Sequence, residues 1–207
     1  MLKRFQRGIA IMLSLAAAMM FYTTAPAAQA GLLGSAKVTL SVPRAGISSN
    51  YEFSFTTTAA TTIKGIKMAW KSNASATNDD PSPGMVAPTL SAQPTGSGID
   101  TDTGTWTIDT TDTDTGIVYI VNSSADHASA GTVVYTISSV TNPTIVTSGT
   151  DGCLYNGTNN SAGTCFIRVK TFDTATIATM QSETVGNIID SVTLPFVVTA
   201  PTTVTAT

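Results

Sequence analysis

The stretch from Asp151 to Phe172 limits the fold of this chain more than any other. It holds the chain's only two cysteines, Cys153 and Cys165, which bracket a loop of glycine, asparagine, threonine and serine. Directly after the loop the side chains alternate between two faces, which is the period of a β-strand. One face carries Cys165, Ile167 and Val169, and the other carries Phe166, Arg168 and Lys170. We predict a disulfide between Cys153 and Cys165 that closes a 13-residue loop onto a central strand.

The first thirty residues have the pattern of a secretory signal peptide. Lys3, Arg4 and Arg7 precede an apolar run of 13 residues, Ile9 to Phe21, and Ala28-Gln29-Ala30 forms a cleavage pattern before Gly31. The run is shorter than the ~20 residues that span a bilayer. We therefore expect residues 1–30 to be removed, with no membrane span afterwards, and the protein to be secreted or held at the cell surface. A disulfide suits that oxidising environment.

Charge and length limit the classes of partner. Removing residues 1–30 takes three cations and no acid, so the formal charge of −3 becomes −6 over 177 residues. An acidic chain with scattered cations has no electrostatic footprint for nucleic acid or anionic lipid. We expect one domain over residues 31–200, followed by a flexible threonine-rich tail at 201–207.

Short alternating segments separated by turn residues recur along the mature chain. Some eight to ten strands with almost no helical periodicity predict an all-β fold, an antiparallel β-sandwich. Residues 72–98 are expected to form a long loop with one short strand around Leu90, and Thr174 to Glu183 no more than one helical turn. Gly65 is interpreted as a bulge. The expected strands are Lys37–Val42, Tyr51–Phe55, Ile66–Trp70, Thr105–Ile108, Ile117–Val121, Thr132–Ser138, Ile145–Val146, Cys165–Phe172 and Ser191–Val198.

Period two also predicts which side chains face the core. In the last strand, Pro195 points away from the apolar face and lacks an N–H, so we expect an edge strand or a bulge. Three polar side chains, Glu52, Lys67 and Lys71, are expected to be exposed. The expected buried residues are Phe53, Phe55, Trp70, Tyr135, Ile167 and Phe196.

An acidic repeat raises the question of a metal ion. The segment Asp100-Thr-Asp102-Thr-Gly104 recurs as Asp112-Thr-Asp114-Thr-Gly116, and crowded hard oxygen ligands suit calcium. The spacing lacks the later glycine and glutamate of an EF-hand loop. We favour turns that flank two strands and expect no cofactor or metal. A calcium site at Asp112 and Asp114 stays the alternative.

The sequence offers no convincing catalytic set. His127 is the only histidine, and it lies beside Asp126 and near Ser123 and Ser124. Sequence neighbours in one loop do not make a triad, because the fold must hold the base between the nucleophile and the acid. We therefore expect that the protein is not an enzyme.

Several short blocks together carry a family resemblance. The chain resembles a group of secreted all-β surface proteins of ultra-small bacteria from the candidate phyla (CPR or Patescibacteria type). The resemblance implies an Ig-like extracellular domain, and it brings no catalytic or binding residues. The blocks that carry it are Pro43–Ala45, Tyr51–Thr56, Ile63–Ile66, Thr141–Thr144 and Phe166–Phe172.

Two functions remain, a structural subunit and a binding module. The threonine-rich chain of low charge favours a non-catalytic subunit of a surface layer or fibre, whose partners are copies of itself or other surface proteins. It would assemble by strand addition through Lys37–Val42 or Val197–Thr205, which carry one charge between them. For Val38–Val42 we favour closure of the protein's own sandwich, and for the tail beyond Pro201 a free or exchanging segment. The alternative is an adhesin-like module for glycan or a host protein, with Trp106 and Tyr155 as candidate contacts.

Overall fold

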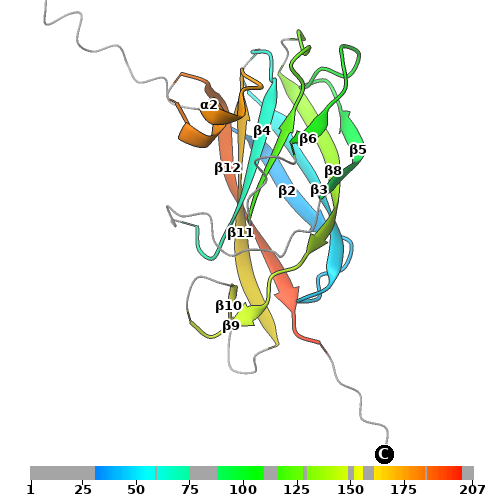
Figure 1. Ribbon diagram of the computed structural model, residues 1–207. Coiled ribbons are helices and arrows are strands. Elements are labelled where there is room, and N and C mark those ends of the chain that lie inside the picture. The colour runs from blue at the N-terminus through cyan, green and yellow to red at the C-terminus, as the bar shows by residue number, and fades with distance from the viewer. Residues whose placement is uncertain are drawn as a thin grey trace, which may run out of the picture.

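The protein forms two β-sheets that pack face to face, which confirms the expected β-sandwich (Figure 1). This computed structural model describes residues 31–58, 60–74, 88–109, 116–127, 130–148, 152–155, 161–184 and 186–201. Within these residues there are twelve strands. The number exceeds the eight to ten expected because the strands Gly31–Leu32 and Cys153–Tyr155 are too short to carry a visible pattern in the sequence.

Sheet A has the strand order β1-β12-β11-β4-β7-β6, with β10 paired to β11 and β9 paired to β10; sheet B has the order β2-β3-β8-β5. Neighbouring strands are antiparallel except β1 with β12 and β9 with β10. The strands of sheet A are β1 (Gly31–Leu32), β4 (Gly65–Lys71), β6 (Thr107–Asp109), β7 (Ile117–Val121), β9 (Ile145–Val146), β10 (Cys153–Tyr155), β11 (Ala162–Phe172) and β12 (Ile188–Thr199). Those of sheet B are β2 (Gly34–Leu40), β3 (Ser48–Thr57), β5 (Thr89–Thr95) and β8 (Gly131–Thr141).

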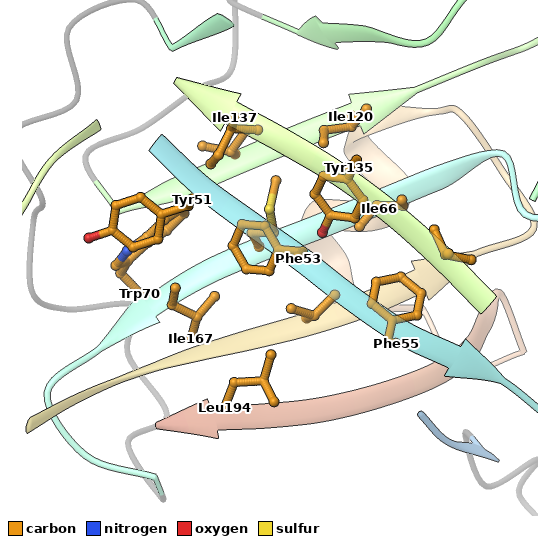
Figure 2. Close-up of a cluster of buried hydrophobic side chains, with 14 of the residues drawn as sticks. Tyr51, Phe53, Phe55, Ile66, Trp70, Ile120, Tyr135, Ile137, Ile167 and Leu194 are labelled. Carbon is orange, nitrogen blue, oxygen red and sulfur yellow. The ribbon is translucent and has the colours of Figure 1, made fainter. Parts of the chain in front are cut away.

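Aromatic side chains from both sheets fill the space between the layers (Figure 2). The Phe53 ring stacks on Tyr135 at 5.1 Å between ring centroids, and the Tyr51 ring meets Trp70 edge-on at 5.7 Å. All six residues expected in the core are buried, with Phe196 the most exposed at 5%. The alternation in β3 shows why, since its tyrosine and phenylalanines occupy one face and Glu52 lies exposed on the other.

Two of the three polar side chains expected at the surface are buried instead. Lys67 is 4% exposed and Lys71 is 0% exposed, so those two predictions are wrong. Their strand, β4, lies between β11 and β7 and is buried along its whole length. Near its start the outer face is covered by a six-residue helix, α2 (Ile177–Ser182). An alternating pattern shows which face is apolar, but it does not show that another segment covers the opposite face.

Gly65 allows this covering helix to approach the sheet. A Cβ atom at Gly65 would lie 2.6 Å from both the Met180 sulfur and the Thr174 carbonyl oxygen. The register of β4 against β11 runs without a shift through Gly65. The predicted bulge is therefore wrong, because this glycine is required by close packing and not by an irregular strand. α2 also exceeds the single turn expected from the sequence.

The last strand is an edge strand over most of its length, as Pro195 predicted. β1 pairs with β12 only at Asp190 and Ser191, and a bridge from Arg44 reaches it again at Thr199. The backbone N–H and C=O groups of successive residues in a strand point to opposite sides. Those of Ser191 and Thr199 form hydrogen bonds on the side away from β11. Pro195 is four residues from each, so its nitrogen lies on the same outer side. Its missing N–H therefore costs the sheet no hydrogen bond.

The expected loop at 72–98 contains the predicted strand around Leu90. It is β5, which pairs with β8 through two register shifts. The residues at 75–87 lie outside the described part of the chain.

Candidate functional site

The first acidic repeat is built around one buried carboxylate. Asp100 is 1% exposed, and all four hydrogen bonds to its carboxylate come from backbone N–H groups. Oδ1 accepts from Asp102 at 3.1 Å and Thr103 at 2.8 Å. Oδ2 accepts from Asp126 at 2.8 Å and His127 at 3.0 Å. The carboxylate thus joins the loop before β6 to the loop after β7.

The electrostatics of Asp100 follow from these bonds. Burial by itself raises the pKa of a carboxyl group, but the four N–H donors stabilise the charged form more strongly, and the net pKa lies well below the usual range. The oxygens therefore stay ionised while their bonding capacity is used by the protein's own backbone. In this repeat the acid has the structural role that the turn interpretation predicted.

The alternative calcium residues, Asp112 and Asp114, lie outside the described residues. Among the residues that are described, no group of three or more histidine, cysteine, aspartate or glutamate side chains comes together in a way that would hold a metal ion. The calcium hypothesis for the second repeat stays a prediction.

The residues considered for catalysis lie on the second of these loops, after β7. Ser123, Ser124 and His127 are exposed. The His127 backbone N–H is bonded to Asp100, and His127 and Asp102 are among the residues that line a pocket of about 270 Å³. In the described part of the chain no hydrogen bond joins His127 to either serine. The Asp126 carboxylate accepts a hydrogen bond from the Thr103 hydroxyl at 3.1 Å and not from His127.

The two aromatic residues considered for ligand binding have different positions. Trp106 is 3% exposed, and its indole Nε1 donates to the Asp100 carbonyl oxygen at 2.9 Å. Its ring is therefore part of the core and not a surface contact. Tyr155 is half-buried in β10, which leaves it as the aromatic candidate of the adhesin hypothesis.

The predicted disulfide is present. Cys153 in β10 and Cys165 in β11 are bonded, with 4.7 Å between their Cα atoms, and both are fully buried. β11 lies between β12 and β4, so the bond joins the loop to a central strand, as the sequence predicted. No described cysteine is free.

A network of buried polar groups closes one end of the sandwich. The Tyr51 hydroxyl donates to Asn142 Oδ1 at 2.7 Å, and Asn142 Nδ2 donates to the carbonyl oxygens of Val42 at 2.6 Å and Arg44 at 2.8 Å. Burial raises the pKa of the Tyr51 hydroxyl well above its ordinary value, so it remains a donor. Tyr51, Asn142 and Arg44 belong to three of the sequence blocks that carry the family resemblance, so these three blocks meet in this network.

Beside this network is a pocket of about 330 Å³. It is lined by Ala45 and Gly46, by residues 144–147 around β9, and by Ala200 and Pro201. Pro201, the last described residue, lies at its rim.

The edge strand β2 provides an open backbone surface. It pairs with β3 on one side, and no described strand pairs with its other side. The Ser41 N–H bonds to the Asn50 carbonyl oxygen at 2.9 Å. Because peptide groups alternate, those of Val38 and Leu40 face the open side. Lys37 is the only charged residue of β2.

The opposite edge of sheet B is less regular. β5 contains Pro94 and pairs with β8 through two register shifts. Bulges and proline are common protections of edge strands. β2 has one register shift, before Lys37, and a regular pairing from there to Leu40.

Two ionic groups were not identified from the sequence. Glu183 lies at the end of α2 in the left-handed conformation, φ 50°, and binds both Lys67, at 3.0 Å, and Lys170. Burial alone raises the pKa of Glu183, but the two ammonium groups lower it more, so the net pKa is below its usual value.

The second group is Asp190, which is 0% exposed in β12. Its side chain points to the same side of β12 as those of Val192 and Leu194. The period-two alternation in the sequence could therefore have predicted that Asp190 faces inward.

Comparison with known protein families, curated proteins and solved structures found no match. No helix in the described residues is long and apolar enough to cross a membrane.

Proposed function

We propose that the protein is a non-catalytic structural subunit of an extracellular surface layer or fibre that assembles by β-strand addition. It would be exported by residues 1–30, and its main partner would be a second copy of itself. The observation that carries the proposal is the open side of β2. A strand that already has one partner offers its free N–H and C=O groups to an added strand.

The donor segment is the tail at 202–207. The residues Val197–Thr199, which were also considered as donors, belong to β12 and pair with β11. Only the residues beyond Pro201 remain for exchange, with the sequence Thr-Thr-Val-Thr-Ala-Thr. Fully extended, six residues reach about 20 Å. This is comparable to the length of an ordinary strand.

Charge and shape on β2 favour this use. Lys37 is the only charge that an added strand meets on β2, and the tail carries no charged side chain that would be repelled. Val38 and Leu40 turn their side chains toward the core, so the open side presents peptide groups. The exposed positions of this strand are Ser35, Lys37 and Thr39, two of which have small side chains. β12 is bonded to Leu33 before β2 and to Pro43 after it, so an added strand would pair with the stretch between these two residues.

The test is oligomer size. The mature chain, residues 31–207, is measured by light scattering over a range of concentrations, beside a chain that ends at Pro201. We expect the longer chain to form larger species as concentration rises and the shorter chain to stay monomeric. Val204→Asp in the full tail should also prevent assembly, because Val204 is the tail's only large apolar side chain.

The acceptor is tested by a matched pair of variants. Val38→Pro removes an N–H on the open side without removing a bond inside sheet B, and Val38→Ala removes similar side-chain packing but keeps that N–H. We expect assembly to be lost with proline and kept with alanine. Electron microscopy should show ordered fibres or sheets for the alanine variant. A full-length chain that stays monomeric at high concentration would end the proposal and leave the glycan or protein adhesin as the better function.

A further inference from the structure

The feature that carries a further inference is the buried carboxylate of Asp190. Its two oxygens accept from Thr58, Oδ1 from the hydroxyl at 3.0 Å and Oδ2 from the backbone N–H at 3.3 Å. In the described part of the chain, no lysine, arginine or histidine forms an ion pair with it. Placing an ionised carboxylate out of water is costly unless a cation or several donors compensate. By contrast, Asp100 has four donors and Glu183 has two lysines.

Gly31 is placed directly against this carboxylate. The parallel pairing of β1 with β12 sets Gly31 opposite Asp190, and the Leu33 N–H holds the register by donating to the Ser191 carbonyl oxygen at 3.2 Å. A Cβ atom at Gly31 would lie 2.0 Å from Asp190 Oδ1, so a side chain does not fit there without movement.

The same measurement limits the position of the Gly31 nitrogen. The nitrogen of a residue lies about 2.5 Å from its Cβ position, so the Gly31 nitrogen is within about 4.5 Å of Oδ1. Opposite charges at that separation interact strongly when they are shielded from water. The nitrogen of one particular residue is therefore held beside a buried acid.

The sequence also indicates that the Gly31 nitrogen becomes a free amine when the leader is removed. Gly31 follows the Ala28-Gln29-Ala30 cleavage pattern. Hydrolysis by a signal peptidase adds water across the Ala30–Gly31 peptide bond. It leaves a carboxylate on Ala30 and an amine on Gly31, and the amine takes up a proton. An α-amino group has an unperturbed pKa of about 7.7–8.0, so it is mostly charged at neutral pH.

We propose that Asp190 is the binding site for the α-ammonium group that leader removal creates on Gly31. Cleavage then replaces a neutral amide N–H by a cation and completes an ion pair with this buried carboxylate, which fastens β1 to β12. The mature N-terminus is thereby a structural part of sheet A, and the uncleaved chain lacks this ion pair. The inference does not depend on strand-addition assembly.

The test compares two N-termini in two backgrounds. One chain begins at Gly31, released from a fusion without extra residues, and the other begins at Ala28 as a mimic of the uncleaved chain. Each is made with Asp190 and with Asp190→Asn, and thermal unfolding is measured at pH 7. We expect the Gly31 chain to melt about 3–8 °C above the Ala28 chain, and the difference to disappear with Asp190→Asn. Glu52→Gln, at an exposed acid, is the matched control and should leave the difference unchanged.

A second measurement does not require the variant to fold. The rate of acylation of the Gly31 α-amine is followed by mass spectrometry in the native chain and in urea. We expect at least about a tenfold slower reaction in the native chain, because a bonded ammonium group is a poor nucleophile. Equal melting temperatures for the two N-termini, a difference that persists in Asp190→Asn, or equal acylation rates would overturn the proposal.

Discussion

Replacing Asp100 with asparagine is expected to destabilise the protein by about 2–6 kcal/mol. The asparagine oxygen can accept two of the four backbone N–H groups, but its NH₂ group would face the other two donors. Each buried donor left without an acceptor costs about 1–3 kcal/mol. The sum is a large part of the roughly 5–15 kcal/mol that stabilises an ordinary domain.

Urea unfolding at pH 7, followed by tryptophan fluorescence, measures this cost. Trp106 is a suitable reporter because its indole N–H donates to the Asp100 carbonyl oxygen. The matched control is Asp102→Asn, which makes the same chemical change at an exposed carboxylate two residues away. We expect the control to change stability by no more than about 0.5 kcal/mol.

The pH dependence provides an independent check with a definite sign. The pKa of Asp100 in the folded protein lies below its unfolded value of about 3.9, so its stabilising effect is fully present above that value and is lost as pH falls toward the folded pKa. The wild-type protein should therefore lose stability more steeply than Asp100→Asn below about pH 4. A cost under about 1 kcal/mol at pH 7, or equal acid slopes in the two proteins, would refute the reasoning.

Four further predictions concern the core, the disulfide and two buried tyrosine hydroxyls. Phe53→Ala should cost about 3–5 kcal/mol in urea unfolding, and a value below about 1 kcal/mol would contradict its stacked position in the core. Reduction of Cys153–Cys165 should cost roughly 3 kcal/mol, while two titratable thiols in the unreduced, denatured protein would exclude the bond. Tyr135→Phe should be neutral or slightly stabilising, because its buried hydroxyl has no hydrogen-bond partner in the described structure. Tyr51→Phe should cost about 1–3 kcal/mol, because it leaves a buried amide oxygen unpaired; equal effects of the two tyrosine changes would contradict this contrast.

Much of the sandwich follows from information within single strands. The alternation in Tyr51–Phe55 is enough to predict the buried face of β3, because every second side chain of a strand points to the same side. Pro195 predicted an edge position because a proline cannot supply a ladder bond. The disulfide could be predicted because the chain has no other cysteine and the two lie close in sequence.

Other features depend on contacts between distant parts of the chain. Lys67 is buried because Glu183, 116 residues later, binds its ammonium group beneath the end of α2. Asp190 is paired with Thr58 and set against Gly31 from the first strand. The sequence determined which faces are apolar, because that is a local property of a strand. Only the tertiary structure decided which polar groups are enclosed, because burial of a charge depends on whichever distant segment covers it and supplies its partner.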